Sequence, residues 1–108
     1  MLRKPRKFTH WDTMNNQRLI EALISVKTPD ELRRLLDDLL TKNEIDQCAL
    51  RLQAAEMLFQ GATYGAIAQT THMSSATIAR ISKMLANRKG GLYEAMVRLH
   101  PHGRRYFD

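Results

Sequence analysis

The sequence predicts an all-α domain of about six short helices, on the strength of three features of its 108 residues. No segment alternates apolar and polar residues with the period of two that a half-buried strand shows. Leucines and isoleucines recur instead at helical spacing, and Ser, Thr and Pro stand where helices would begin. A chain of this length is large enough for one domain with a modest core.

The net charge of +6 is unevenly distributed along the chain. Residues 1–11 contribute +4 and form a basic N-terminal arm, which either follows a DNA backbone or stays disordered in solvent. Residues 12–56 contribute −3, whereas residues 57–93 contain four basic side chains and no acid. This segregation would attract a polyanion to the two basic segments, although a basic surface with no nucleic-acid role is the alternative.

The first two predicted helices lie within residues 12–40. Asp12 would cap a helix that runs to about Val26, and a second helix starts at Thr28. Thr28 as N-cap, with Pro29 first and Glu31 third in the helix, is a strong start signal. Apolar residues at helical spacing indicate the buried sides of both helices: Leu19, Ile20, Leu23 and Ile24 in the first, and Leu32, Leu35, Leu36, Leu39 and Leu40 in the second.

A third helix is expected from about Glu44 to Gln60. Thr41 and Glu44 repeat the capping pattern, and Gly61 would end the helix. We expect the single cysteine, Cys48, on the buried side as a small core residue and not as a nucleophile. The other residues expected on that side are Ile45, Leu52, Ala55 and Phe59.

The last three helices are expected over about residues 64–71, 75–87 and 92–99. The segment "NRKGG" at 87–91 separates the last two as a basic break. Residues 100–108 contain Pro and Gly and are expected to form an irregular tail.

Residues 64–87 match the spacing of a helix-turn-helix. Ala68 is a small residue in the middle of the first helix, Ser74 is a good N-cap for the second, and Ile78 follows four residues later. His72 occupies the turn position where glycine is usual because φ > 0 is common there. An ordinary helical hairpin, whose Ser and Thr only cap and solvate, is the alternative.

Short side chains at the start of the second helix would allow its backbone to approach a DNA groove closely. Hydroxyls can meet phosphates or base edges, and Ala or a Thr methyl can touch a thymine methyl. The preceding helix would sit against the DNA backbone. The predicted DNA-binding residues are Gly65, Gln69, Ser74, Ser75, Ala76, Thr77, Ala79, Arg80, Lys83, Arg88 and Lys89.

The chain shows no pattern typical of an enzyme, a metal site or a membrane segment. The four histidines have no metal-ligand spacing, and no Ser-His-Asp or phosphate-loop arrangement occurs. No apolar run approaches the roughly 20 residues that span a bilayer. With one cysteine and no secretory signal, we expect a cytoplasmic protein.

At several of these residues the sequence resembles the tryptophan repressor (TrpR) superfamily, and its YerC/YecD group most closely. The matching features are "LTKNE" at 40–44, Arg51, Gly61 and "ATIAR" at 76–80, within a resemblance that covers roughly residues 28–97. In that family two chains interlace their N-terminal helices, and each half of the dimer presents a helix-turn-helix to a palindromic operator. The resemblance therefore implies a homodimeric regulator associated with the bacterial nucleoid.

The resemblance also implies a tryptophan corepressor between Arg51 and Arg80, with Thr41 as a further pocket residue. Ile81 stands where that family has a glycine, and Met84 where it has a serine. These larger side chains would fill the space that the indole needs, so we expect no cofactor.

Together these patterns predict a TrpR-like DNA-binding domain over residues 12–99. The expected function is that of a sequence-specific transcriptional regulator, a repressor, which binds a palindromic operator as a homodimer. The expected partners are double-stranded DNA and a second copy of the chain. The alternatives are a non-specific nucleoid or replication accessory protein and a helical module that docks a protein.

Overall fold

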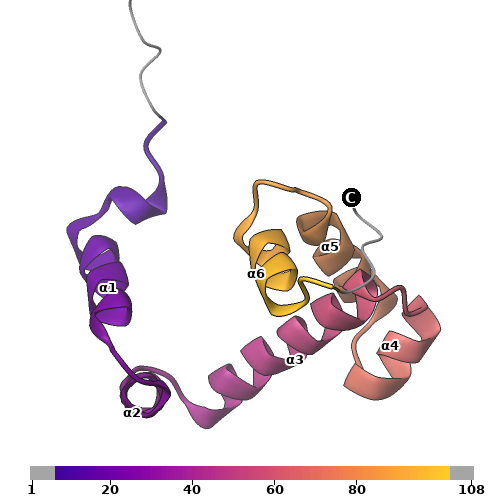
Figure 1. The fold of residues 1–108 in the computed structure, drawn as a ribbon, viewed down its shortest axis with the longest axis horizontal. Helices are drawn as coiled ribbons and strands as arrows, with labels where there is room; N and C mark the ends of the chain where they lie inside the picture. Colours follow the sequence, from indigo (N-terminus) through magenta and orange to yellow (C-terminus); the bar gives the residue numbers. More distant parts are fainter. Residues whose placement is uncertain (1–6, 103–108) are drawn as a thin grey trace, which may run out of the picture. The chain divides into compact units, whose positions relative to one another are not determined.

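The computed structural model describes residues 7–102, which form one short 3₁₀ turn and six α-helices (Figure 1). No strand occurs among these residues, so the predicted all-α class is confirmed. The chain divides into two compact units, residues 1–42 and residues 43–108. Parts of the predicted basic arm (1–6) and of the predicted tail (103–108) lie outside the described residues.

The first unit contains η1 (His10–Asp12), α1 (Met14–Ser25) and α2 (Pro29–Leu39). The prediction that Asp12 caps α1 is wrong. The carboxylate of Asp12 accepts the backbone N–H of Thr9 at 2.7 Å and closes a capping box on η1. Thr13 caps α1 instead, because its hydroxyl accepts the N–H of Asn16 at 3.3 Å.

The predicted start of α2 is confirmed. The Thr28 hydroxyl accepts the backbone N–H of Glu31 at 3.1 Å, and Pro29 is the first helical residue. The Glu31 carboxylate accepts the N–H of Lys27 at 2.6 Å, one residue before the donor that a capping box would use. The first turn of α2 is therefore closed by two side chains of its own segment.

The apolar residues of the first unit are not enclosed. None of its described residues is buried, and Ile24, which was predicted on the buried side of α1, is 77% exposed. Leu19 and Ile20 of α1 are also exposed, and Leu23 is half-buried. Two short helices offer too little surface to build a core of their own, so the predicted burial fails within a single chain.

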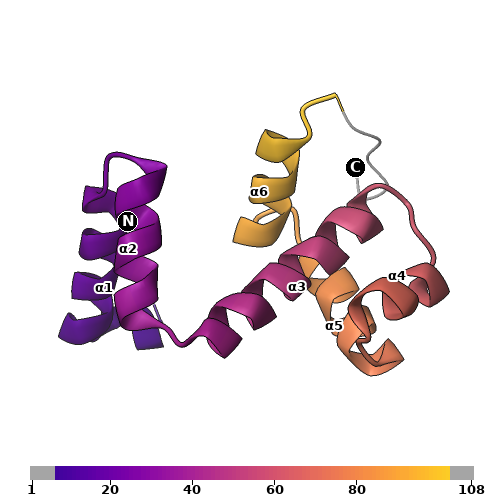
Figure 2. The ribbon, with the colours of Figure 1, turned by 90° about the horizontal axis from the view of Figure 1, so that it is seen from below.

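The second unit is built around α3 (Lys42–Phe59). The helices α4 (Tyr64–Thr71), α5 (Ser75–Leu85) and α6 (Gly91–Leu99) gather around the C-terminal half of α3, as Figures 1 and 2 show. Their apolar faces enclose the core of this unit: Ala54, Ala55, Leu58, Phe59, Ile67, Ile78, Ile81, Leu85 and Met96.

The N-terminal half of α3 lies outside this core. Ala55 and Phe59 are buried as predicted, but Ile45 is half-buried and Leu52 is exposed. Cys48 was predicted to be a core residue and is exposed instead. The reason is that α4, α5 and α6 cover only the last two turns of α3.

The predicted end of α3 at Gly61 is confirmed. Gly61 has φ 88°, a left-handed conformation that glycine adopts without a steric cost. Its N–H donates to the Leu58 carbonyl at 3.0 Å, and the N–H of Ala62 donates to the Met57 carbonyl at 2.9 Å. These two bonds form a Schellman motif that turns the chain towards α4.

His100, which follows α6, contacts the end of α3 through its ring. The His100 Nε2 atom lies 2.8 Å from a carboxylate oxygen of Glu56, and the His100 ring lies 6.1 Å from the ring of Phe59. The loop between α5 and α6 differs slightly from its predicted bounds. The helix α5 ends at Leu85, two residues before its predicted end, and α6 begins at Gly91, one residue before its predicted start.

Candidate DNA-binding surface

The helices α4 and α5 form the predicted hairpin, joined by the turn 72–74. His72 adopts the left-handed conformation that its position predicts, with φ 61° and ψ 20°. Its N–H donates to the carbonyl of Ala68 at 2.8 Å and so closes α4. His72 thus takes the conformation that glycine usually provides in this turn.

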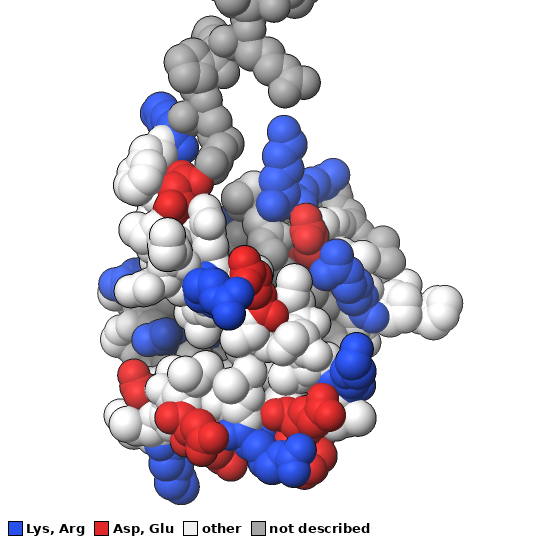
Figure 3. Space-filling view, turned by 90° about the vertical axis from the view of Figure 1, so that its left-hand side faces the viewer, with Lys and Arg blue, Asp and Glu red and all other residues white. Residues whose placement is uncertain are grey.

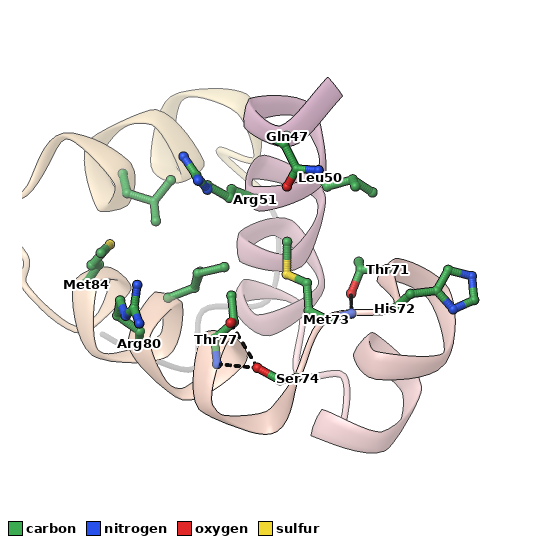
Figure 4. Close-up of a pocket in the computed structure, with 12 residues that line it drawn as sticks. Gln47, Leu50, Arg51, Thr71, His72, Met73, Ser74, Thr77, Arg80 and Met84 are labelled. Carbon is green, nitrogen blue, oxygen red and sulfur yellow. Dashed lines mark hydrogen bonds between the residues drawn. The ribbon is translucent and has the colours of Figure 1, made fainter. Parts of the chain in front are cut away.

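Hydrogen bonds of the chain also hold the entry into α5 (Figure 4). The Ser74 hydroxyl accepts the backbone N–H of Thr77 at 3.2 Å, which confirms Ser74 as the N-cap. The hydroxyls of Ser74 and Thr77 also lie 3.0 Å apart. Ile78 and Ile81 are both buried, so the opposite side of α5 packs in the core.

The outward side of α5 carries five of the eleven predicted DNA-binding residues. Ser75, Ala76, Ala79, Arg80 and Lys83 are all exposed. Thr77 is half-buried, and its hydroxyl lies beside that of Ser74. The exposed side chains of α5 are therefore short at the N-terminal end of the helix and cationic further along it.

The predicted residues of α4 are exposed as well. Gly65 and Gln69 both face solvent. A Cβ atom added to Gly65 would meet only the Thr63 hydroxyl, at 4.0 Å. The fold itself does not require glycine at this helical position, where glycine costs about 1 kcal/mol relative to alanine.

Two more predicted residues, Arg88 and Lys89, are exposed in the loop after α5. This loop turns through a bond from the Gly90 N–H to the Asn87 carbonyl at 2.9 Å. Because residues 57–93 contain no acid, the hairpin and this loop carry positive charge alone. Such a surface attracts polyanions.

A hollow of about 1060 Å³ lies between α3, the turn and α5 (Figure 4). Two of the three predicted pocket residues, Arg51 of α3 and Arg80 of α5, line it. The third, Thr41, belongs to the first unit and is not among the lining residues. Ile81 and Met84, which the sequence also indicated for this space, line it too. The sequence did not indicate the other lining residues as part of a pocket: Gln47, Leu50, Thr71, His72, Met73, Ser74, Thr77 and Leu92.

Ile81 and Met84, which were predicted to fill the space of an indole, both line this hollow. Ile81 is buried at the floor, whereas Met84 is 52% exposed. Each side chain lines the hollow without closing it, because Met84 extends largely into solvent.

Other kinds of site are absent from the described part of the chain. Among residues 7–102, no three His, Cys, Asp or Glu side chains are placed to hold a metal ion. None of the described helices is long and apolar enough to cross a membrane.

An all-α core that presents a capped hairpin on its surface defines a helix-turn-helix protein. A comparison with protein families agrees with this class, since the family model described as "Trp repressor protein" matches residues 14–100. The chain belongs to the Trp repressor family.

Two similar proteins support this assignment. The chain is 43% identical over 67 residues to the uncharacterized protein YerC of Bacillus subtilis (strain 168), a match that covers 62% of this chain and 64% of YerC. The crystal structure of a TrpR-like protein from Eubacterium eligens ATCC 27750 aligns with a TM-score of 0.73 and 35% identity. That alignment covers 82% of this chain and 92% of the other.

The Ser74 cap gives a first testable prediction. Ser74→Ala removes the acceptor for the Thr77 N–H and should lower the free energy of unfolding by about 1 kcal/mol. Urea unfolding at one fixed protein concentration measures the change. Ser75→Ala is the matched control and should stay within about 0.5 kcal/mol of the unaltered chain. Equal losses in the two variants would show that the cap does not stabilise α5.

Proposed function

We propose that this protein is a DNA-binding transcriptional regulator whose α5 helix enters the major groove of a palindromic operator. The observation that carries the proposal is the outward side of α5 within a helix-turn-helix. Its side chains are short at the N-terminal end of the helix and cationic further along. Membership of the Trp repressor family supports DNA binding, and it supports repression of transcription over activation.

The exposed residues of α5 suit close approach to base edges. Ser75, Ala76 and Ala79 allow the backbone of α5 to lie deep in the groove, where hydroxyls can bond to base edges and methyl groups can contact thymine. Arg80 and Lys83 lie one and two turns further along and can reach bases or phosphates. We therefore assign sequence recognition to the first two turns of α5.

The surrounding residues suit contact with the phosphate backbone. In a helix-turn-helix the first helix crosses the DNA backbone, so Gly65 and Gln69 of α4 would lie beside it. The absence of a side chain at Gly65 is explained by such a neighbour, since the fold leaves that space open. Arg88 and Lys89 follow α5 and would meet phosphates at the edge of the site.

We further propose that the regulator acts as a homodimer. Met14 and Ile24 of α1 are 79% and 77% exposed, and half of the Leu39 side chain in α2 is exposed. Figure 3, which faces the side of α1 and α2, shows broad uncharged areas between the charged side chains. A second copy would bury these apolar residues, and a dimer would match two half-sites about 34 Å apart.

Phosphate contact by Lys83 is tested by the salt dependence of DNA binding. Lys83→Ala should weaken binding to all sequences and reduce the slope of log affinity against log salt by about 0.9, the change expected when one phosphate is no longer neutralised. Fluorescence anisotropy over a salt series measures both quantities. Arg34→Ala removes the same charge from the acidic segment 12–56 and is the matched control. An unchanged slope in Lys83→Ala would place the contact surface elsewhere.

Gly65 should show opposite effects on stability and on DNA binding. Gly65→Ala fits the fold and should raise the free energy of unfolding by about 0.5–1 kcal/mol, because alanine favours a helix. The added methyl group would hold the DNA backbone away, so affinity for DNA should fall. Gly91→Ala, at the start of α6, also has open space and should raise stability without changing DNA affinity. Unaltered DNA affinity in Gly65→Ala would contradict the proposed placement of α4.

The dimer is tested at Ile24. Ile24→Lys places a charge on the exposed apolar side of α1 and should shift the protein from dimer to monomer in sedimentation velocity. Gln17→Lys adds the same charge at an exposed polar position of α1 and should leave the dimer intact. A monomer in the unaltered protein at micromolar concentration would disprove the homodimer.

A further inference from the structure

The exposed side chains at the start of α5 restrict which features of a base pair this helix can read directly. Ser75, Ala76 and Ala79 face solvent, whereas Ile78 and Ile81 are buried on the opposite side. No Asn, Gln, Asp or Glu occurs anywhere in α5. The helix therefore lacks the amides that form paired hydrogen bonds with adenine and the carboxylates that accept from the amino group of cytosine.

The exposed polar side chains of α5 do not single out an A·T pair. A hydroxyl both donates and accepts hydrogen bonds, so Ser75 can meet the edge of any base. Arg80 and Lys83 are exposed further along the helix and can bond to guanine or to a phosphate. The C5 methyl group of thymine is the apolar feature of the major groove, and it calls for an apolar partner.

Two exposed methyl groups of α5 match that feature. Ala76 and Ala79 are three residues apart, so their Cβ atoms lie on one side of the helix, roughly 5–6 Å from each other. Base pairs are stacked about 3.4 Å apart, so methyl groups at this spacing can meet neighbouring base pairs. Contact between an alanine methyl and a thymine methyl removes apolar surface from water on both molecules, which favours binding.

We propose that Ala76 and Ala79 determine specificity for thymine, because their methyl groups contact the C5 methyl groups of thymines in neighbouring base pairs of each half-site. This inference rests on the proposed function, in which α5 enters the major groove. Uracil pairs with adenine as thymine does and presents the same hydrogen-bonding groups, but it lacks the methyl group. Replacement of thymine by uracil therefore separates the methyl contact from every hydrogen bond.

The test compares thymine with uracil in otherwise identical DNA. The purified full chain selects duplexes from a random pool at low salt, and fluorescence anisotropy measures its affinity for the most enriched duplex. Each thymine is then replaced by uracil in turn, in both half-sites at once. At two neighbouring base pairs of each half-site, we expect binding to weaken about fourfold per methyl group, the effect of losing one buried methyl group. Uracil at the other thymines should leave the affinity unchanged.

Glycine variants assign each methyl contact to a residue. In Ala79→Gly the loss caused by uracil should vanish at one of the two base pairs and persist at the other, and Ala76→Gly should show the reverse. Each loss is a ratio of two affinities of the same protein, so the destabilising effect of glycine in a helix cancels. Ala49→Gly makes the same change at an exposed position of α3, outside the hairpin, and is the matched control that should keep both losses.

The outcomes separate thymine recognition from the proposed function. An enriched motif with equal affinity for the thymine and uracil duplexes would overturn thymine recognition alone and would leave the two alanines as helix-forming residues. Losses that persist at both base pairs in Ala76→Gly and Ala79→Gly would assign the methyl contacts to other residues and would also overturn it. Binding without an enriched motif, or no binding to any duplex, would refute the proposed function and thymine recognition together.

Discussion

The whole candidate DNA-binding surface depends on the apolar contact between α5 and the C-terminal half of α3. Ile78, Ile81 and Leu85 are buried along one side of α5, where they share a core with Leu58 and Phe59 of α3. Burying each large aliphatic side chain contributes about 1.5–3 kcal/mol, which strongly disfavours any rotation of α5 about its axis. Because this side is fixed inward, the short and cationic residues of α5 can only face outward.

Packing thus orients the surface, and its charge and backbone geometry then decide how it can contact DNA. The absence of acids over residues 57–93 leaves this surface uniformly positive, and charge of this kind binds any phosphate backbone. Sequence preference needs the closer contacts that Ser75, Ala76 and Ala79 permit. The capped turn supplies the third requirement, because a recognition helix whose angle varied would lose the register between its side chains and the bases.

Much of this arrangement could be predicted from the sequence, since it depends on local signals. The Ser74 cap, the left-handed His72 and the end of α3 at Gly61 each follow from residue types at fixed spacing. The burial of Cys48 could not be predicted correctly, because helical spacing indicates an apolar side without showing what covers it. The same limit applies to the hollow beside Arg51 and Arg80, whose volume depends on the angle between α3 and α5.

Recognition of a specific DNA sequence by α5 can be tested by selection from a pool of random duplexes at two salt concentrations. We expect enrichment of a palindrome with half-sites one helical turn apart, and an affinity for DNA that falls as salt increases. Salt-dependent binding without an enriched motif would contradict sequence recognition by α5 and would indicate a non-specific DNA-binding protein. Absence of binding at both salt concentrations would contradict DNA binding itself.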